Sequence, residues 1–161
     1  MKKEDALKKF LVEQGEFSED EINEAVIKKE WDSYYNEYRF DVCGDEYLVM
    51  DDGKAYATAY HEISQLLWAF DTDFILDHLK DDIKDGNNPV DLDELKACID
   101  LVKEKLCEGA NAIIHALIED LEEFVDDAIA ADGTGHFISL YDGKEHEVTV
   151  DGETYYIYRL S

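Results

Sequence analysis

The chain has 161 residues, of which 45% are hydrophobic and 12% aromatic, and it carries 41 acidic against 15 basic residues for a formal net charge of −26. The hydrophobic fraction is too high for an acidic disordered tail and predicts a globular fold. The charge argues against direct binding to DNA, RNA or an anionic membrane surface, because those partners attract Lys and Arg. It indicates a partner that is itself basic.

The cysteines and the N-terminal segment favour a cytoplasmic protein. Cys43, Cys98 and Cys107 are an odd number without paired spacing, which is typical of a reducing compartment. The N-terminal segment MKKEDALKKF contains acidic residues before any apolar run, so no secretory signal is expected. No apolar stretch approaches the roughly 20 residues of a membrane span. No composition shift marks a domain boundary, so we expect a single acidic domain over residues 1–161.

The N-terminal residues predict two helices. Residues 2–14 have helical composition, and Gly15 ends this helix. Ser18 and Glu21 form a capping box, which predicts that a second helix begins there. Apolar residues at helical spacing extend this second helix to residue 38: Ile27, Trp31, Tyr34, Tyr35 and Tyr38.

From residue 38 the pattern changes to that of strands. Residues 38–42 and 46–50 predict a hairpin with its turn at Gly44. Asp51 is a suitable cap for a helix over about 52–70. The buried side of this helix is expected to consist of Ala55, Ala59, Ile63, Leu66, Leu67 and Phe70.

The middle of the chain predicts further helices. A short helix near 73–83 is followed by a loop over 85–89 that holds the only proline. Leu92, Leu95, Ile99, Val102 and Leu106 repeat at three and four residues, the pattern of a helix that packs on another helix. The same apolar spacing continues to residue 131, and one unbroken helix over residues 92–131 would be about 60 Å long, longer than a domain of this size is wide. We therefore expect a break near Gly109.

The C-terminal residues predict strands. Residues 136–140, 145–150 and 154–159 alternate and are joined by Asp142-Gly143 and Asp151-Gly152, both strong hairpin signals. The elements together predict an α+β fold, with four to five helices packed on an antiparallel sheet made of an N-terminal hairpin and a C-terminal three-stranded meander. The order of the strands stays open.

Acidic residues concentrate where the last long helix is expected. Six of them occur within nine residues without one Lys or Arg. On a helix, carboxylates four residues apart lie about 6 Å apart along the axis, close to the spacing of phosphates along a DNA strand. Such pairs of like charges destabilise a helix slightly. Their accumulation therefore indicates either a solvent-exposed face without a function or a functional role for the charge. The residues are Glu119, Asp120, Glu122, Glu123, Asp126 and Asp127.

Two further acidic runs extend the pattern. One contains Asp77, Asp81 and Asp82, diluted by Lys80 and Lys84. Acidity spread over several helices predicts a negatively charged surface of fixed shape. We take these three residues with the six above as the candidate partner-binding residues. The other run consists of Asp91, Asp93, Glu94, Asp100, Glu104 and Glu108.

Metal chemistry is an alternative that the residues support weakly. Residues 51–62 have the outline of a calcium loop, but Gly53, Ala55 and Tyr56 stand where ligands and glycine are needed. His136, Asp142 and His146 fall in the predicted meander and would be the candidate ligands of a transition metal. No HxH or HExxH spacing supports such a site, and His61, His78 and His115 are isolated, so we expect no metal and no cofactor.

Nucleophilic catalysis has little support. There is no GxSxG motif and no phosphate-binding glycine-rich loop, since Gly133-Thr134-Gly135 leads into a predicted strand. Arg39 and Arg159 are the only arginines, which is poor equipment for binding phosphate or carboxylate substrates. The sequence therefore favours a protein that is not an enzyme.

In four segments the chain resembles small acidic proteins encoded by bacteriophages and prophages. These segments are Glu46–Met50, Leu67–Phe70, Gly133–Gly143 and Tyr155–Arg159. No activity of that group transfers residue by residue. The resemblance implies a setting, a phage gene product in a bacterial cytoplasm. In that setting a very acidic domain is similar, by charge and context alone, to the DNA-mimic inhibitors that act on restriction and CRISPR enzymes.

Three functions follow as hypotheses. The first is an inhibitor that occupies the basic nucleic-acid-binding surface of a host defence nuclease or DNA-binding protein, without binding nucleic acid or membrane itself. The second is a phage structural or assembly protein whose acidity serves solubility. The third is a metal-dependent enzyme that uses the C-terminal meander. The target and the oligomeric state stay open.

Overall fold

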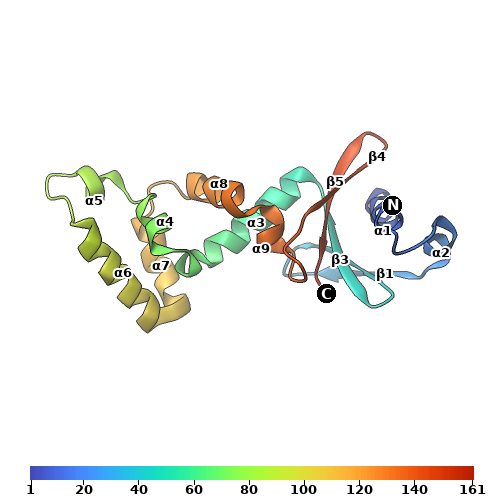
Figure 1. Cartoon of the computed structure of the whole chain (residues 1–161), viewed down its shortest axis with the longest axis horizontal. Coiled ribbons are helices and arrows are strands. Elements are labelled where there is room, and N and C mark those ends of the chain that lie inside the picture. The colour runs from blue at the N-terminus through green and yellow to red at the C-terminus, as the bar shows by residue number, and fades with distance from the viewer. The chain divides into compact units, whose positions relative to one another are not determined.

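The computed structural model describes residues 1–161 and divides into two compact units (Figure 1). The first, here called the sheet unit, comprises Met1–Ala59 and Asp132–Ser161, and the second, the helical unit, comprises Tyr60–Ala131. The predicted α+β class with an antiparallel sheet is confirmed. The helices are shorter and more numerous than the four to five expected. That the whole chain behaves as one domain stays a prediction. No helix is both long and apolar enough to cross a membrane.

The sheet has five antiparallel strands in the order β1-β2-β3-β5-β4. The first three form a meander, and β5 joins it by pairing with β3. The C-terminal hairpin β4–β5 therefore enters the sheet through its second strand, which leaves β1 and β4 as the two edges. The strands are β1 (Ile27–Asp32), β2 (Glu37–Val42), β3 (Asp45–Met50), β4 (His146–Val150) and β5 (Glu153–Arg159).

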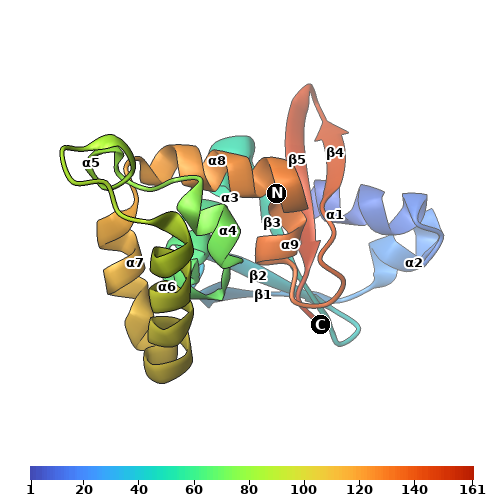
Figure 2. The ribbon, with the colours of Figure 1, turned by 60° about the vertical axis from the view of Figure 1, so that its left-hand side comes forward.

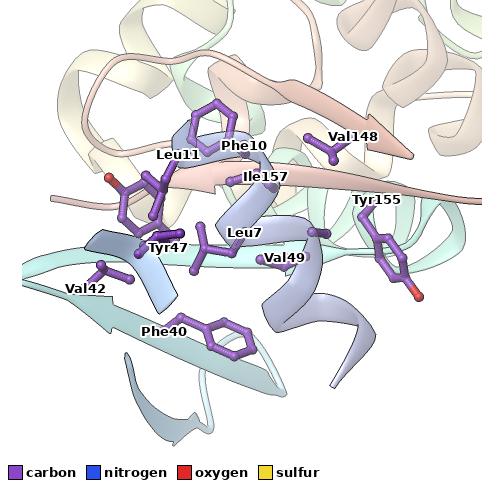
Figure 3. Packing of buried hydrophobic residues seen from close by; sticks show 12 residues of the cluster. Leu7, Phe10, Leu11, Phe40, Val42, Tyr47, Val49, Val148, Tyr155 and Ile157 are labelled. Atoms are coloured by element: carbon purple, nitrogen blue, oxygen red, sulfur yellow. The ribbon is translucent and has the colours of Figure 1, made fainter. Parts of the chain in front are cut away.

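The core of the sheet unit lies under two helices, α1 (Lys2–Glu13) and α2 (Glu19–Glu24). The predicted apolar side of α1 is buried, and Figure 3 shows Leu7 and Leu11 beside Tyr47 of β3. Phe10 makes an edge contact with Tyr47, with ring centroids 6.4 Å apart. The capping box of α2 is confirmed, since the hydroxyl of Ser18 accepts from the backbone N–H of Glu21.

The predicted helix over residues 18–38 is wrong beyond Glu24. Residues 27–32 form strand β1 instead, in which Ile27 pairs with Val42 and Trp31 with Tyr38. Ile27 and Trp31 are four residues apart, a spacing that fits one face of a helix and also one face of a strand. Residues 26–38 contain two β-branched and four aromatic residues, which favour a strand once a partner strand is present.

The turn after β1 shows why the helix does not continue. The carboxylate of Asp32 accepts from the backbone N–H groups of Tyr34 and Tyr35, and Asn36 adopts a positive φ of 51°. These are local interactions of a turn, which Asp and Asn side chains form readily. The predicted hairpin at Gly44 is confirmed as β2–β3, and the expected N-terminal hairpin is therefore a three-stranded meander.

The predicted strand over residues 136–140 is also wrong. Residues 134–138 form a short helix, α9 (Thr134–Ile138), so the C-terminal meander is the two-stranded hairpin β4–β5. Ser139 follows α9, and its hydroxyl donates to the carbonyl of Arg159 at 2.7 Å, which ties this segment to the end of β5. The turn at Asp151-Gly152 is confirmed, with both residues at positive φ.

Gly135 allows α9 to approach the backbone of Lys144 closely, and its replacement is expected to lower the stability of the protein. A Cβ atom at this position would lie 2.4 Å from the backbone carbon of Lys144. We expect Gly135→Ala to lower the free energy of unfolding by about 3 kcal/mol, because backbone must shift. Chemical denaturation checks this. Gly53→Ala is the control: its Cβ would meet only the Asp51 carboxylate at 3.7 Å. Equal stability of the two variants would contradict the prediction.

The helical unit contains several short helices where the sequence predicts fewer and longer ones (Figure 2). The predicted helix over 52–70 ends at Gln65, and the predicted helix over 73–83 is two helices. The break near Gly109 is confirmed, and a second break, over residues 118–120, was not expected. The elements are α3 (Asp52–Gln65), which begins in the sheet unit, η1 (Leu67–Ala69), α4 (Thr72–Leu76), α5 (Asp81–Asp85), α6 (Leu92–Leu106), η2 (Cys107–Ala110), α7 (Asn111–Leu117) and α8 (Leu121–Asp132).

Polar contacts attach α6 to the start of α4. The ammonium group of Lys103 donates to the carbonyl of Phe70 at 2.5 Å and to the hydroxyl of Thr72 at 3.0 Å. That hydroxyl donates in turn to the carboxylate of Asp100. Lys96 pairs with Asp73 at 2.9 Å. One side of α6 therefore packs against α4.

Candidate functional site

A single antiparallel β-bridge between Leu79 and Ile118 joins two acidic segments of the helical unit that are far apart in the sequence. The backbone N–H of Lys80 donates to the carbonyl of Leu117 at 2.8 Å, and that of Glu119 donates to the carbonyl of His78 at 2.9 Å. The bridge places the end of α4 and the start of α5 beside the start of α8. Two of the three acidic runs seen in the sequence therefore share one region.

Aromatic rings form the base of this region. Phe124 of α8 is 0% exposed, and its ring centroid lies 4.9 to 5.0 Å from those of Phe70, Phe74 and His78. These contacts are edge-on, the arrangement that aromatic pairs prefer. The cluster fixes α8 relative to α4, and with it the positions of the carboxylates on both helices.

All nine predicted partner-binding residues lie in this region and are exposed. We call the surface that they form the acidic face. The bridge thus places the two segments that carry these residues next to each other. The acidic face consists of Asp77, Asp81, Asp82, Glu119, Asp120, Glu122, Glu123, Asp126 and Asp127.

Three members of the acidic face have structural roles. The carboxylate of Asp120 accepts from the backbone N–H of Glu123 at 3.2 Å and so caps α8. The carboxylate of Glu119 accepts from the backbone N–H of Asp81 at 3.3 Å, at the start of α5. Asp127 lies 3.2 Å from Nε2 of the buried His78. Part of the acidity therefore holds the two segments together.

The predicted helical spacing of the carboxylates needs correction. Glu119 and Asp120 precede α8, because Ile118 is extended and takes part in the bridge. The pair formed by Glu119 and Glu123 is therefore not on one helix, whereas Glu123 and Asp127 are. Glu122 and Glu123 lie in the first turn of α8, where the helix dipole stabilises carboxylates. Like-charge repulsion is smaller here than the sequence alone indicated.

Five other carboxylates of the acidic face have no partner of their own. The side chains of Asp77, Asp81, Asp82, Glu122 and Glu123 are exposed and make no hydrogen bond or ion pair. Nothing in the fold requires five unpaired charges in one region. They are the part of the acidic face that is available to another molecule.

The charge is uneven between the two units. The helical unit holds 19 acidic and five basic residues, which accounts for −14 of the net charge of −26. Of its basic residues, Lys96 and Lys103 are already bound to α4 and its flanking residues. Two residues of the third acidic run also have structural roles: Asp91 caps α6, and Asp100 accepts from Thr72.

The residues considered as metal ligands are not brought together. No group of three or more His, Cys, Asp or Glu side chains is placed to hold a metal ion. The ring of His146 packs on Phe10 in the sheet unit, with centroids 4.7 Å apart, while His136 packs on Phe137. Burial raises the pKa of Asp142, but hydrogen bonds from the Lys144 backbone and the Ser139 hydroxyl outweigh it, so the pKa is lowered.

Two features of the site were missed from the sequence. His78 is isolated in the sequence but is buried beside Asp127 in the structure, and the Leu79–Ile118 bridge has no local sequence pattern. A single bridge involves one residue from each segment, so no periodic pattern in the sequence predicts it.

Comparison with protein families, curated proteins and solved structures finds no match for the chain.

Proposed function

We propose that the protein binds, through its acidic face, the basic nucleic-acid-binding surface of a host defence nuclease or DNA-binding protein, and that it acts by occupying that surface in a bacterial cytoplasm. The supporting observation is the bridge between Leu79 and Ile118, which gathers the two acidic segments and leaves five exposed carboxylates unpaired. In this proposal the protein is not an enzyme and needs no cofactor.

The arrangement suits a partner that recognises a nucleic-acid backbone. Such partners hold rows of Lys and Arg at positions set by phosphates. Carboxylates anchored on α5 and α8 present fixed charges to those residues, since Phe124 holds α8 in place. Because the helix backbone is already held in place, only the side-chain rotamers become ordered on binding, and charge-assisted hydrogen bonds between carboxylates and Arg are stronger than neutral ones.

The proposal is tested by competition. The tagged protein is used to capture partners from a bacterial lysate, and the captured protein is then challenged with duplex DNA or with RNA. We expect nucleic acid to release the partner in proportion to its own affinity, because both ligands occupy one surface. A partner that binds this protein and nucleic acid simultaneously would contradict the proposal.

Salt gives a second test of the same interaction. We expect the association rate constant to fall about 100-fold to 1000-fold between low salt and several hundred millimolar salt, because screening removes electrostatic steering. Stopped-flow mixing of the purified partner with this protein measures it. A complex whose association is insensitive to salt would indicate an apolar interface and argue against mimicry of nucleic acid.

A further inference from the structure

Helix α6 exposes some of the apolar side chains that the sequence predicts to be buried against another helix. Only Ile99 of that seam is fully buried, whereas Leu92 and Leu106 are exposed, together with Leu101 at 53%. The reason is that α7 (Asn111–Leu117) has 7 residues against the 15 of α6, so it covers only part of α6 and leaves a groove between the two helices. A groove flanked by exposed leucines offers apolar surface that a partner could bury.

The groove has a volume of about 210 Å³ and is apolar throughout. Its walls are formed by Leu95, Ile99 and Val102 of α6 and by Ile114 and Leu117 of α7. Cys98 also lines it and is exposed. Such a groove accepts an apolar side chain from another molecule.

The exposed side of α6 next to this groove carries a four-residue stripe. Glu94, Cys98, Leu101 and Lys105 are spaced four, three and four residues apart, so they follow one side of the helix. All four are exposed, and the side chains of Glu94 and Lys105 make no ion pair. The opposite side of the helix is the one that Lys96 and Lys103 attach to α4.

This stripe is complementary to itself. When two copies of α6 run antiparallel about a two-fold axis between residues 99 and 100, Glu94 of one copy faces Lys105 of the other, and Cys98 faces Leu101. The axis generates each pair twice. An acidic residue near the start of the helix and a basic one in its last turn are the arrangement that an antiparallel pair requires.

The local charge permits such a contact. Residues 91–117 carry six acidic and three basic residues, whereas the rest of the helical unit carries 13 acidic and two basic. The α6–α7 segment is therefore less acidic than the remainder of the helical unit taken together. Repulsion between more distant charges is screened beyond about 8 Å at physiological ionic strength.

We propose that the protein forms a two-fold symmetric homodimer through antiparallel packing of α6, in which Leu101 of each copy enters the α6–α7 groove of the other and Glu94 pairs with Lys105. The inference goes beyond the proposed function and does not depend on it. A dimer of this kind carries two acidic faces related by the axis, which suits a partner that itself binds nucleic acid as a two-fold dimer.

The test is the mass of the full chain in solution, by light scattering or sedimentation at physiological salt and up to about 100 µM, where an association with micromolar Kd is nearly complete. We expect twice the chain mass of 18.5 kDa. Leu101→Asp is expected to raise the dimer Kd about 100-fold or more. Leu140→Asp, at a leucine that is 73% exposed in the sheet unit, is the matched control and is expected to leave the Kd unchanged.

Charge reversal identifies the pairing. Glu94→Lys alone and Lys105→Glu alone are each expected to raise the Kd about tenfold, and the two together are expected to restore it, because the pair is re-formed with reversed signs. A chain that stays monomeric at the highest concentration overturns the proposal. So does a dimer that Leu101→Asp leaves intact, or a charge-reversed double variant no better than the single ones.

Discussion

Neutralising four carboxylates of the acidic face is expected to weaken binding to a basic partner about 100-fold or more. The variant combines Asp81→Asn, Asp82→Asn, Glu122→Gln and Glu123→Gln. These side chains are exposed and unpaired, so their loss removes steering and direct contacts with Lys and Arg without removing a contact of the fold. The affinity of the purified partner, measured by calorimetry at low salt, checks the result.

The choice of positions spares the carboxylates that hold the site together. Glu119, Asp120 and Asp127 stay unchanged, because they accept from the start of α5, cap α8 and contact His78. Removal of first-turn acids costs α5 and α8 some helix-dipole stabilisation, about 0.3–1 kcal/mol each, which relief of repulsion between neighbouring acids partly offsets. The variant should therefore stay folded, as circular dichroism will show.

The matched control neutralises four exposed acidic residues of the sheet unit and changes the net charge equally. It combines Glu16→Gln, Asp20→Asn, Glu24→Gln and Glu147→Gln. We expect the control to lose less than about tenfold in affinity, since it alters only the long-range field. Equal losses in both variants would mean that bulk charge alone matters, and the acidic face would lose its assignment.

Phe124→Ala is expected to produce the largest loss of stability among single substitutions at the site, about 3–5 kcal/mol. The side chain is fully buried and contacts three aromatic rings, so its removal leaves a cavity that rigid neighbours cannot fill. For a chain of this length the loss corresponds to a fall of roughly 10 °C in the melting temperature. Thermal unfolding followed by circular dichroism measures it.

Tyr34→Ala is the control for this substitution. Tyr34 is 60% exposed, and its ring packs edge-on against Tyr35 in the turn after β1. We expect a change below about 1 kcal/mol. If Phe124→Ala is as mild as Tyr34→Ala, the aromatic cluster does not hold α8. Binding provides a second readout, since a displaced α8 should weaken the partner complex although every carboxylate is retained.

Several elements could be predicted because neighbouring residues decide them. The start of α2 follows from Ser18 and Glu21, whose mutual hydrogen bonds satisfy backbone groups within one turn. The turns at Gly44 and Gly152 follow from the positive φ that glycine adopts without strain. Helix α1 follows from an apolar stripe long enough to exclude a strand period.

The wrong predictions fall where the local pattern fits two structures. Ile27 and Trp31 suit a helix or a strand, and only pairing with Val42 and Tyr38 selects the strand. Residues 136–140 alternate like a strand, yet Gly135 allows close approach to Lys144 and Ser139 is tied to Arg159, which favours a short helix. Contacts between segments distant in the sequence outweighed the local preference in both cases.

The net charge, the α+β class and the identity of the nine carboxylates could be predicted from the residues alone, because each is a property of composition or of near neighbours. The position of β5 between β3 and β4, and the Leu79–Ile118 bridge that joins the two acidic segments, became evident from the folded chain. It alone left the stripe on α6 exposed, because a short α7 cannot cover a helix of 15 residues. These features depend on which apolar surfaces the folded chain buries against one another, and that balance is set by the whole chain rather than by any one segment.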